Sequence, residues 1–219
     1  MWNEQQNRAF ESKKDIGKTL LLGTEPFADS DLTESECCIC MGDISEKKTL
    51  ETCGHCFCRE CICRAFECKP VCPVCGTVYG SLVGNMPING IMSTVKKPSW
   101  HLQGYEAYGT ILITYSFPGG IQGKEHPNPG MSYSGTYREA FLPDSPEGNR
   151  VAGLLRRAFD QRLTFTIGTS VTTGRSNVIT WNDIHHKTSR CGGPECFGYP
   201  DPTYLTRVQE ELKAKGISV

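Results

Sequence analysis

Residues 37–75 read CCICMGDISEKKTLETCGHCFCRECICRAFECKPVCPVC, and 11 of the 13 cysteines in the chain lie in this stretch. Eight of its residues form four closely spaced pairs, which are Cys37-x2-Cys40, Cys53-x-His55, Cys58-x2-Cys61 and Cys72-x2-Cys75. Zinc prefers four thiolate or imidazole ligands in a tetrahedron, and a Cys-x-x-Cys turn places two thiolates on one ion. The spacing therefore predicts two closed, structural zinc sites, with no position left for a reacting water.

The order of these ligands, seven Cys and one His, resembles that of the RING finger over about forty residues. In that family the pairs interleave, a feature that the spacing alone does not show. The resemblance implies one zinc on Cys37, Cys40, Cys58 and Cys61, and the other on Cys53, His55, Cys72 and Cys75. Because such a small unit has little apolar core, metal supplies most of its folding energy, on the order of 10 kcal/mol per structural zinc.

The remaining cysteines fall outside this register. For those within the stretch we expect packing or free thiols, although an alternative register that uses Cys38 or Cys56 as a ligand breaks the two-residue spacing. Cys191 and Cys196 would need two further ligands to hold a third zinc. The six cysteines outside the register are Cys38, Cys56, Cys63, Cys68, Cys191 and Cys196.

A RING finger binds a ubiquitin-conjugating enzyme (E2) charged with ubiquitin on a shallow apolar surface. The resemblance places this surface on Ile39, Phe66 and Pro73, and the alternative is that these side chains only pad the zinc core. One position departs from the family. Many RING fingers carry a basic residue directly after the last ligand, whereas Gly76 and Thr77 stand there in this chain. We therefore expect the RING finger alone to have weak intrinsic activity.

Composition limits the classes of function. The 219-residue chain has a net charge of −1, and its first 36 residues hold four Lys/Arg against eight Asp/Glu. No strong field favours nucleic acid or a membrane surface. We expect residues 1–36 to be acidic and mostly flexible, and we expect no membrane span and no signal peptide. Clustered cysteines without a secretory signal indicate a reducing compartment, either the cytoplasm or the nucleus.

Beyond the cysteines, the pattern changes to periodic segments after a Gly/Asn/Pro-rich stretch. Strands are predicted at residues 110–115, 163–167 and 177–181. Two helices are predicted as well, one opened by Asp144-Ser145-Pro146-Glu147 and one that begins at Asp201-Pro202 and stops at Gly216. Their apolar stripes are Val151, Leu154, Leu155, Ala158 and Phe159 in the first, and Tyr204, Leu205, Val208 and Leu212 in the second.

Five strings in this part of the chain resemble the Deltex C-terminal domain and occur in the order of that family. They are GTILITY (109–115), HPNPG (126–130), FLPD (141–144), WNDIHHKT (181–188) and GYPDP (198–202). With the cysteine stretch, the resemblance covers roughly residues 37–217. The expected architecture is a small zinc-bound RING finger over residues 37–76, a linker over 77–85, and a compact α+β domain, the Deltex C-terminal domain, over 86–219.

The Deltex resemblance implies a function. RING finger and C-terminal domain form the minimal E3 ubiquitin ligase unit, and the C-terminal domain binds NAD+ and ADP-ribose in a groove and recruits ADP-ribosylated proteins. Some members join ADP-ribose to the C-terminal carboxylate of ubiquitin, or ubiquitin to a hydroxyl of ADP-ribose. A role in Notch signalling is implied as well. An alternative is an ADP-ribose-reading scaffold with a weak or inactive RING finger. A nucleic-acid binder is disfavoured, because no basic stripe accompanies the cysteines.

The residues to which the family's transfer chemistry is assigned match His185 and Glu211 in this sequence. In an extended segment, His185 and His186 point to opposite faces, so that one can line a groove while the other packs. At 100° per residue, Glu211 falls at the edge of the apolar stripe of its helix, whereas Glu210 faces solvent. A partly shielded Glu211 is suited to act as a general base on a ribose hydroxyl. The alternative is that both histidines are structural and that Glu211 only forms a salt bridge.

The groove itself has candidate ligand-binding residues. Gly168, Thr169 and Ser170 end a predicted strand and are expected to offer backbone N–H groups to a pyrophosphate, and Arg138 to neutralise it. His185, Trp181, Phe197 and Tyr199 are expected to stack on the bases or hydrogen-bond the dinucleotide, with a place in the core as the alternative for each aromatic residue. Some family members carry His at the position of Phe197, which predicts NAD+ binding with poor ADP-ribosylation.

Overall fold

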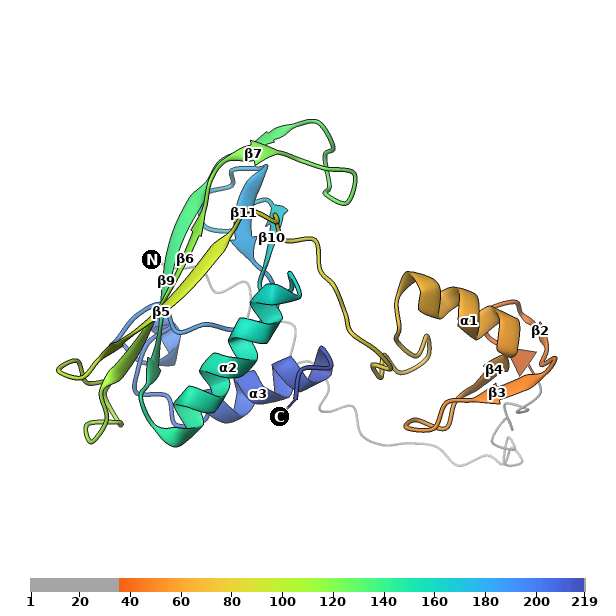
Figure 1. Cartoon of the computed structure of the whole chain (residues 1–219), viewed down its shortest axis with the longest axis horizontal. Helices are drawn as coiled ribbons and strands as arrows, with labels where there is room; N and C mark the ends of the chain where they lie inside the picture. The colour runs from red at the N-terminus through yellow and green to blue at the C-terminus, as the bar shows by residue number, and fades with distance from the viewer. Residues whose placement is uncertain (1–35, 219) are drawn as a thin grey trace, which may run out of the picture. The chain divides into compact units, whose positions relative to one another are not determined.

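The computed structural model describes residues 36–218, and the acidic segment predicted for residues 1–36 lies, apart from Glu36, outside them. The cysteine stretch folds into two short antiparallel hairpins followed by one helix (Figure 1). Its elements are β1 (Glu36–Cys37) paired with β2 (Gly42–Asp43), β3 (Lys47–Thr49) paired with β4 (Cys56–Cys58), and α1 (Arg59–Cys68). Its apolar core is small, because only Leu50, Phe57 and Ile62 join the buried cysteines in it.

The rest of the described chain is built on one three-stranded antiparallel sheet, in the order β5-β6-β9, and two hairpins (Figure 1). The sheet contains β5 (Ile91–Lys97), β6 (Thr110–Phe117) and β9 (Thr136–Pro143). The hairpins are β7 (Gly120–Ile121) with β8 (Ser132–Tyr133), and β10 (Phe165–Gly168) with β11 (Val178–Trp181). The predicted strands are confirmed, whereas β5 and β9 were not predicted.

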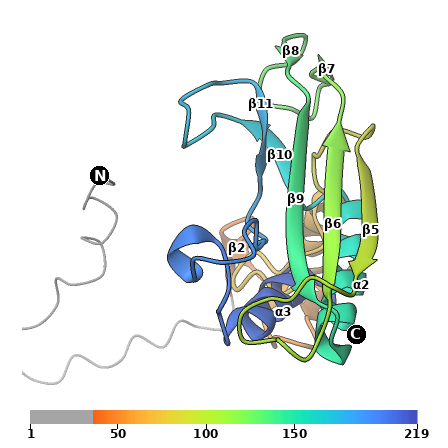
Figure 2. The same cartoon turned by 90° about the vertical axis from the view of Figure 1, so that its left-hand side faces the viewer.

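The middle strand β6 explains where the core lies. Its side chains alternate in direction, as in any strand, and Ile111, Ile113, Tyr115 and Phe117 are all buried on one face. Helices α2 (Pro146–Asp160) and α3 (Tyr204–Ala214) lie together on that side of the sheet (Figures 1 and 2). Their apolar stripes join the same core cluster as β6. The predicted α+β domain is thus confirmed.

Helix α2 begins as the sequence predicts. The Ser145 Oγ accepts a hydrogen bond from the Gly148 N–H at 3.0 Å, and Pro146 stands in the first turn. Gly148 is required here, because a Cβ at this position would lie 1.9 Å from the Pro143 carbonyl oxygen. The whole predicted stripe of this helix is buried.

Helix α3 begins at Tyr204, later than the predicted start at Asp201-Pro202. The Asp201 carboxylate does not cap the helix; it accepts from the Thr203 hydroxyl at 3.1 Å and binds two cations described below. Gly216, with φ of +74°, follows the helix end as predicted. The 3₁₀ helix η1 (Pro194–Cys196) precedes this region. Among the described helices, none has the length and apolar character that a membrane crossing requires.

Candidate functional site

The eight predicted zinc ligands gather into two groups, and within each group the ligand atoms all lie within 4.8 Å of one another. The groups are Cys37, Cys40, Cys58 and Cys61, and Cys53, His55, Cys72 and Cys75. The Cys40 and Cys58 Sγ atoms are 3.9 Å apart, close to the edge of about 3.8 Å that a tetrahedron with Zn–S bonds of about 2.3 Å requires. The donor set therefore fits two zinc ions, and the interleaved pairing is confirmed.

The alternative ligand register does not agree with this geometry. Neither Cys38 nor Cys56 belongs to a group of candidate metal ligands among the described residues. Cys38 is exposed, and the Cys56 Sγ instead contacts the Thr49 hydroxyl at 3.3 Å. Cys191 and Cys196, considered for a third zinc, are likewise in neither group.

One residue that supports the second ligand group was not predicted. The Tyr79 hydroxyl donates to the Cys53 Sγ at 3.1 Å and accepts from the Cys53 N–H at 2.9 Å. Its ring stacks on Phe66 with the centroids 5.7 Å apart. Tyr79 therefore orients a zinc ligand from outside the ligand set. The sequence signal was an aromatic residue shortly after the last ligand, within the segment predicted as a linker.

The predicted E2-binding residues differ in exposure. Ile39 is 37% exposed and Pro73 is exposed, so both are accessible to a partner. Phe66 is half-buried against the zinc core and Tyr79, so it partly fits the packing alternative. Val74, which was not predicted, is 54% exposed beside Pro73. Ile39, Pro73 and Val74 thus offer apolar surface at the two ligand turns.

A groove of about 470 Å³ opens on the C-terminal part of the chain. It is bordered by β9, the loop after β10, the segment after β11, and the residue that follows η1. Six of the predicted binding residues line it, namely Arg138, Thr169, Ser170, Trp181, His185 and Phe197. Lining residues that were not predicted include Val171, Thr172, Thr180, Asn182 and Thr188. Among the described residues, no Asp or Glu side chain lines this groove, which suits an anionic ligand rich in hydroxyl groups.

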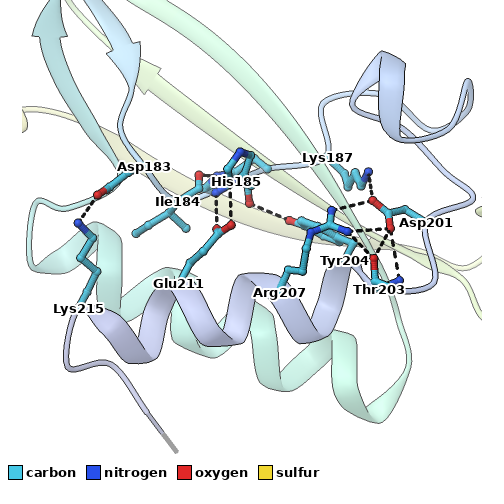
Figure 3. A network of polar contacts seen from close by, with 11 residues as sticks. Asp183, Ile184, His185, Lys187, Asp201, Thr203, Tyr204, Arg207, Glu211 and Lys215 are labelled. Carbon is cyan, nitrogen blue, oxygen red and sulfur yellow. Dashed lines mark hydrogen bonds and ion pairs between the residues drawn. The ribbon is translucent and has the colours of Figure 1, made fainter. Parts of the chain in front are cut away.

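His185, which lines the groove, pairs with Glu211, 26 positions later in the sequence (Figure 3). The His185 Nδ1 lies 2.6 Å from Glu211 Oε1, and the His185 backbone N–H donates to Oε2 at 2.8 Å. The Tyr204 hydroxyl donates to the His185 carbonyl oxygen at 3.1 Å. Both carboxylate oxygens are therefore engaged by His185. Glu211 holds the Nδ1 proton in place and leaves Nε2 as the imidazole nitrogen available to a ligand.

These contacts belong to a ladder between residues 183–187 and residues 201–215, which include α3 (Figure 3). Asp183 pairs with Lys215 at one end, and the Lys187 Nζ lies 2.6 Å from Asp201 Oδ2 at the other. The odd-numbered side chains of the segment face these partners, and of these Lys187 is itself buried, whereas Ile184 and His186 are buried on the other side of the segment. Period-two alternation in an extended segment produces this division. As predicted, His185 and His186 point to opposite faces and Glu211 is more shielded than Glu210.

Asp201 is the most buried group in the ladder, with its side chain only 2% exposed. The Arg207 guanidinium binds its Oδ2 at 2.9 Å, opposite Lys187. The hydrogen bonds from Arg207 and then Lys187 hold the pKa of the Asp201 carboxyl far below its usual range. This buried cluster ties the start of α3 to the segment that carries His185.

Comparison with known proteins agrees with both parts of the chain. Residues 35–76 match the family model described as "Ring finger domain", and residues 83–217 match the one described as "Deltex C-terminal domain". The chain belongs to the Deltex family.

Similar proteins carry names from the same family. The mouse (Mus musculus) protein named "Probable E3 ubiquitin-protein ligase DTX3" is 65% identical over 190 residues, which cover 87% of this Deltex chain and 55% of that protein. The human (Homo sapiens) protein of the same name is 66% identical over 185 residues, 84% of this chain and 53% of that protein. Mouse "E3 ubiquitin-protein ligase DTX4" is 44% identical over 176 residues, 77% of this chain and 28% of that protein. The chain thus spans about half the length of the DTX3 relatives.

His186, which also borders the Deltex groove, is a buried residue with a structural role. Its Nδ1 donates to the Ile184 carbonyl oxygen at 2.8 Å, so Nε2 accepts from the Tyr115 hydroxyl at 2.8 Å. Burial lowers the pKa of His186 to about 4. The ring stacks on Trp181 with the centroids 4.3 Å apart.

The expectation that Trp181 stacks on a base needs correction. Phe165, its partner across the β10–β11 hairpin, stacks on one face at 4.4 Å, and His186 stacks on the other. With both faces covered by protein, Trp181 contributes only an edge to the Deltex groove.

The other two aromatic candidates lie in contrasting places. Tyr199 is fully buried, and its hydroxyl donates to the Phe141 carbonyl oxygen at 2.9 Å, so it does not line the groove as predicted but forms part of the core. Phe197 is 61% exposed and lines the groove from a left-handed backbone position with φ of +52°. Phe197 is therefore the predicted aromatic side chain with a face open to a ligand.

The structure also corrects part of the expectation that residues 168–170 offer backbone N–H groups to a pyrophosphate. The Ser170 N–H donates to the Arg175 carbonyl oxygen at 2.8 Å, so this amide is not available to a pyrophosphate. The Thr169 and Ser176 hydroxyls lie 3.0 Å apart. Gly168 remains within β10 and does not line the groove. Arg138 is exposed on β9, where its guanidinium donates to the Tyr137 carbonyl oxygen at 3.0 Å and has further N–H groups for a ligand.

Proposed function

We propose that this Deltex chain acts as a RING-type E3 ubiquitin ligase that recruits a ubiquitin-charged E2 and promotes transfer to an acceptor. The observation that carries the proposal is the pair of complete, interleaved ligand groups, beside which Ile39, Pro73 and Val74 expose apolar surface. The names of the DTX3 and DTX4 relatives support it. The RING finger forms no thioester of its own, so acceleration comes from holding the charged E2 in a reactive orientation.

Autoubiquitylation with purified activating enzyme and a broad panel of E2 enzymes tests this proposal. Ile39→Ala is expected to reduce product strongly without loss of zinc. Cys63→Ser, at an exposed position of α1 outside both ligand groups, is the matched control and should leave activity unchanged. Absence of product with every E2 would reject the ligase. ADP-ribose binding by the same inactive sample would then favour a reading scaffold, as Gly76 and Thr77 after the last ligand suggest.

For the groove we propose NAD+ and ADP-ribose as ligands and ADP-ribosylated proteins as recruited targets. A volume of about 470 Å³ is of the size that small-molecule sites have. Arg138 supplies a forked donor for the pyrophosphate, Phe197 an open aromatic face for a base, and the threonine hydroxyls partners for ribose. Over residues 36–218, the lining contains no carboxylate that would repel phosphate.

Calorimetry with NAD+ and with ADP-ribose measures this binding directly. Arg138→Ala and Phe197→Ala are each expected to weaken ADP-ribose binding by about tenfold. Arg150, an exposed residue of α2 away from the groove lining, provides the matched arginine control as Arg150→Ala. Unchanged affinity in both groove variants would place the ligand elsewhere.

The geometry of His185 supports a role in transfer of ubiquitin to ADP-ribose. We propose that Nε2 takes the proton of a ribose hydroxyl as that oxygen attacks the ubiquitin thioester, while the E2 cysteine leaves as thiolate. Glu211 stabilises the imidazolium that forms and fixes the ring through Nδ1. This assigns the base to His185 and a positioning role to Glu211, in place of the general-base role expected from the sequence.

Rates of this transfer separate the two roles. His185→Ala is expected to lower the rate by roughly 10²- to 10⁴-fold. Glu211→Gln should lower it less and shift its pH dependence, because the amide still accepts from the backbone N–H. Glu210→Gln, at the exposed neighbouring position, is the control. A Glu211→Gln variant more impaired than His185→Ala would return the base role to Glu211. Radiolabelled NAD+ with ubiquitin and the conjugating cascade tests ADP-ribosylation of ubiquitin, which Phe197 leads us to expect to be weak.

A further inference from the structure

A second depression, of about 520 Å³, borders the groove. Thr188 lines both, and the other polar residues that line the second one are His101, Gln103, Ser189 and Arg190. Thr188 follows His185 by three residues in an extended segment, which corresponds to about 10 Å at roughly 3.3 Å per residue. When a ligand reacts at His185, the part of it that extends past Thr188 therefore enters this second depression.

An aromatic ring holds the Arg190 guanidinium in place without neutralising its charge. Its guanidinium lies over the Trp100 indole at 4.4 Å from the ring centroid, and the Lys97 ammonium lies 5.6 Å from the same centroid. Over residues 36–218, neither cation forms an ion pair with a carboxylate. A cation–π contact orients the guanidinium plane and leaves its N–H edge free. Of these residues Arg190 lines the depression, and its charge gives the lining a positive character.

His101 adds a further polar group. Its Nδ1 donates to the Tyr108 carbonyl oxygen at 3.0 Å, and Nε2 has no partner within the described residues. Glu106 comes from the same loop, but its carboxylate accepts from the Gly104 N–H at 2.7 Å and does not line the depression. Among the described residues, no Asp or Glu side chain lines the depression that Arg190 and His101 border.

We propose that this depression is a subsite for an acidic side chain of the peptide that carries ADP-ribose, with Arg190 as its main contact. The proposal rests on the proposed binding of ADP-ribose in the groove. An arginine fork matches the two oxygens of a carboxylate. A second nucleotide unit is disfavoured, because Phe141, the aromatic residue in the lining, is only 7% exposed and offers no open face to a base.

Calorimetry on the full chain tests the subsite with three probes: ADP-ribose, a serine-ADP-ribosylated peptide with glutamates beside the modified serine, and the same peptide with glutamines. The wild-type chain is expected to bind the glutamate peptide about three- to fivefold more tightly than the glutamine peptide, as for a partly exposed ion pair. Arg190→Ala should abolish this preference and leave the affinity for ADP-ribose unchanged, whereas Arg150→Ala should keep it. Equal affinities in the wild type, or a preference that survives Arg190→Ala, would overturn the proposal.

A second measurement separates the subsite from the groove. Unmodified glutamate peptide at millimolar concentration is titrated into the ¹⁵N-labelled chain while the Trp100 indole N–H resonance is followed. We expect this resonance to shift with the glutamate peptide, not with the glutamine peptide, and to return at high salt. A shift in a chain that fails to bind ADP-ribose would reject the proposed groove ligand and keep the subsite. An unmoved resonance would reject the subsite even where ADP-ribose binds.

Discussion

The two parts of this Deltex chain are stabilised by different means. In residues 36–76 the buried cluster has six residues, of which three are the cysteines Cys37, Cys58 and Cys72. In residues 83–217 the cluster draws on the main sheet, the β10–β11 hairpin and both long helices, and it contains no cysteine. The first part needs metal in place of a core, whereas the second can bury enough apolar surface to fold without metal. The difference teaches that one chain can encode structure through ligand spacing in one region and through burial pattern in the next.

Removal of zinc is expected to have the largest effect, and it tests whether the two parts are stabilised independently. A chelator is expected to unfold residues 36–76, because each structural zinc contributes on the order of 10 kcal/mol. Residues 83–217 should remain folded, since their core holds no metal ligand. Amide NMR spectra with and without chelator, followed by re-addition of zinc, measure this. Loss of signals from β6 along with those of α1 would contradict independent stabilisation.

The second region depends on its buried ion cluster. Asp201→Asn leaves Lys187, whose side chain is 5% exposed, as a buried and poorly compensated charge, which should cost about 3–5 kcal/mol of stability. Since the folded-state pKa of Asp201 is depressed, its contribution is present above the ordinary aspartate range and is lost as pH falls below it. Denaturant unfolding followed through the C-terminal tryptophans measures both effects.

The exposed end of the same ladder gives the matched control for Asp201. Asp183→Asn removes a pair with Lys215 whose carboxylate side chain is 57% exposed, so a change of at most about 1 kcal/mol is expected. Equal losses in the two variants would show that burial does not decide the contribution of a pair in this ladder.

A milder acid effect is expected from His186. Its pKa is lowered by burial to about 4 in the folded chain, against 6.5 as the ordinary value. The unfolded chain therefore binds the proton first, so stability falls as pH drops from about 6.5 to about 4, by roughly 3 kcal/mol in all. His186→Gln should flatten the pH dependence of unfolding over this interval, which denaturant unfolding at a series of pH values measures. An unchanged slope in His186→Gln would show that another group titrates there.

The sequence predicted the zinc ligands and much of the fold, for identifiable physical reasons. Ligand spacing specifies the turns, and β6 and α2 show regular burial, so both could be predicted from the pattern. Strand β9 could not, because the side chains at its start are exposed on both faces. The role of Trp181 was missed because it depends on its register opposite Phe165, which sequence periodicity does not reveal. The pairing of His185 with Glu211 required the family resemblance, since no local pattern connects positions 26 apart.

The smallest expected effect concerns Tyr79. It tests how far the stability of residues 36–76 depends on side-chain packing as well as on zinc. Tyr79→Phe keeps the ring stacked on Phe66 but removes the hydroxyl that donates to the Cys53 Sγ and accepts from the Cys53 N–H. A loss of about 1 kcal/mol is expected, seen as faster zinc transfer to a chromogenic chelator from one of the two sites. Tyr137→Phe, at an exposed position of β9, is the control. Equal acceleration at both zinc sites would mean that Tyr79 acts on the fold of the whole region, while no acceleration would leave zinc alone as the source of its stability.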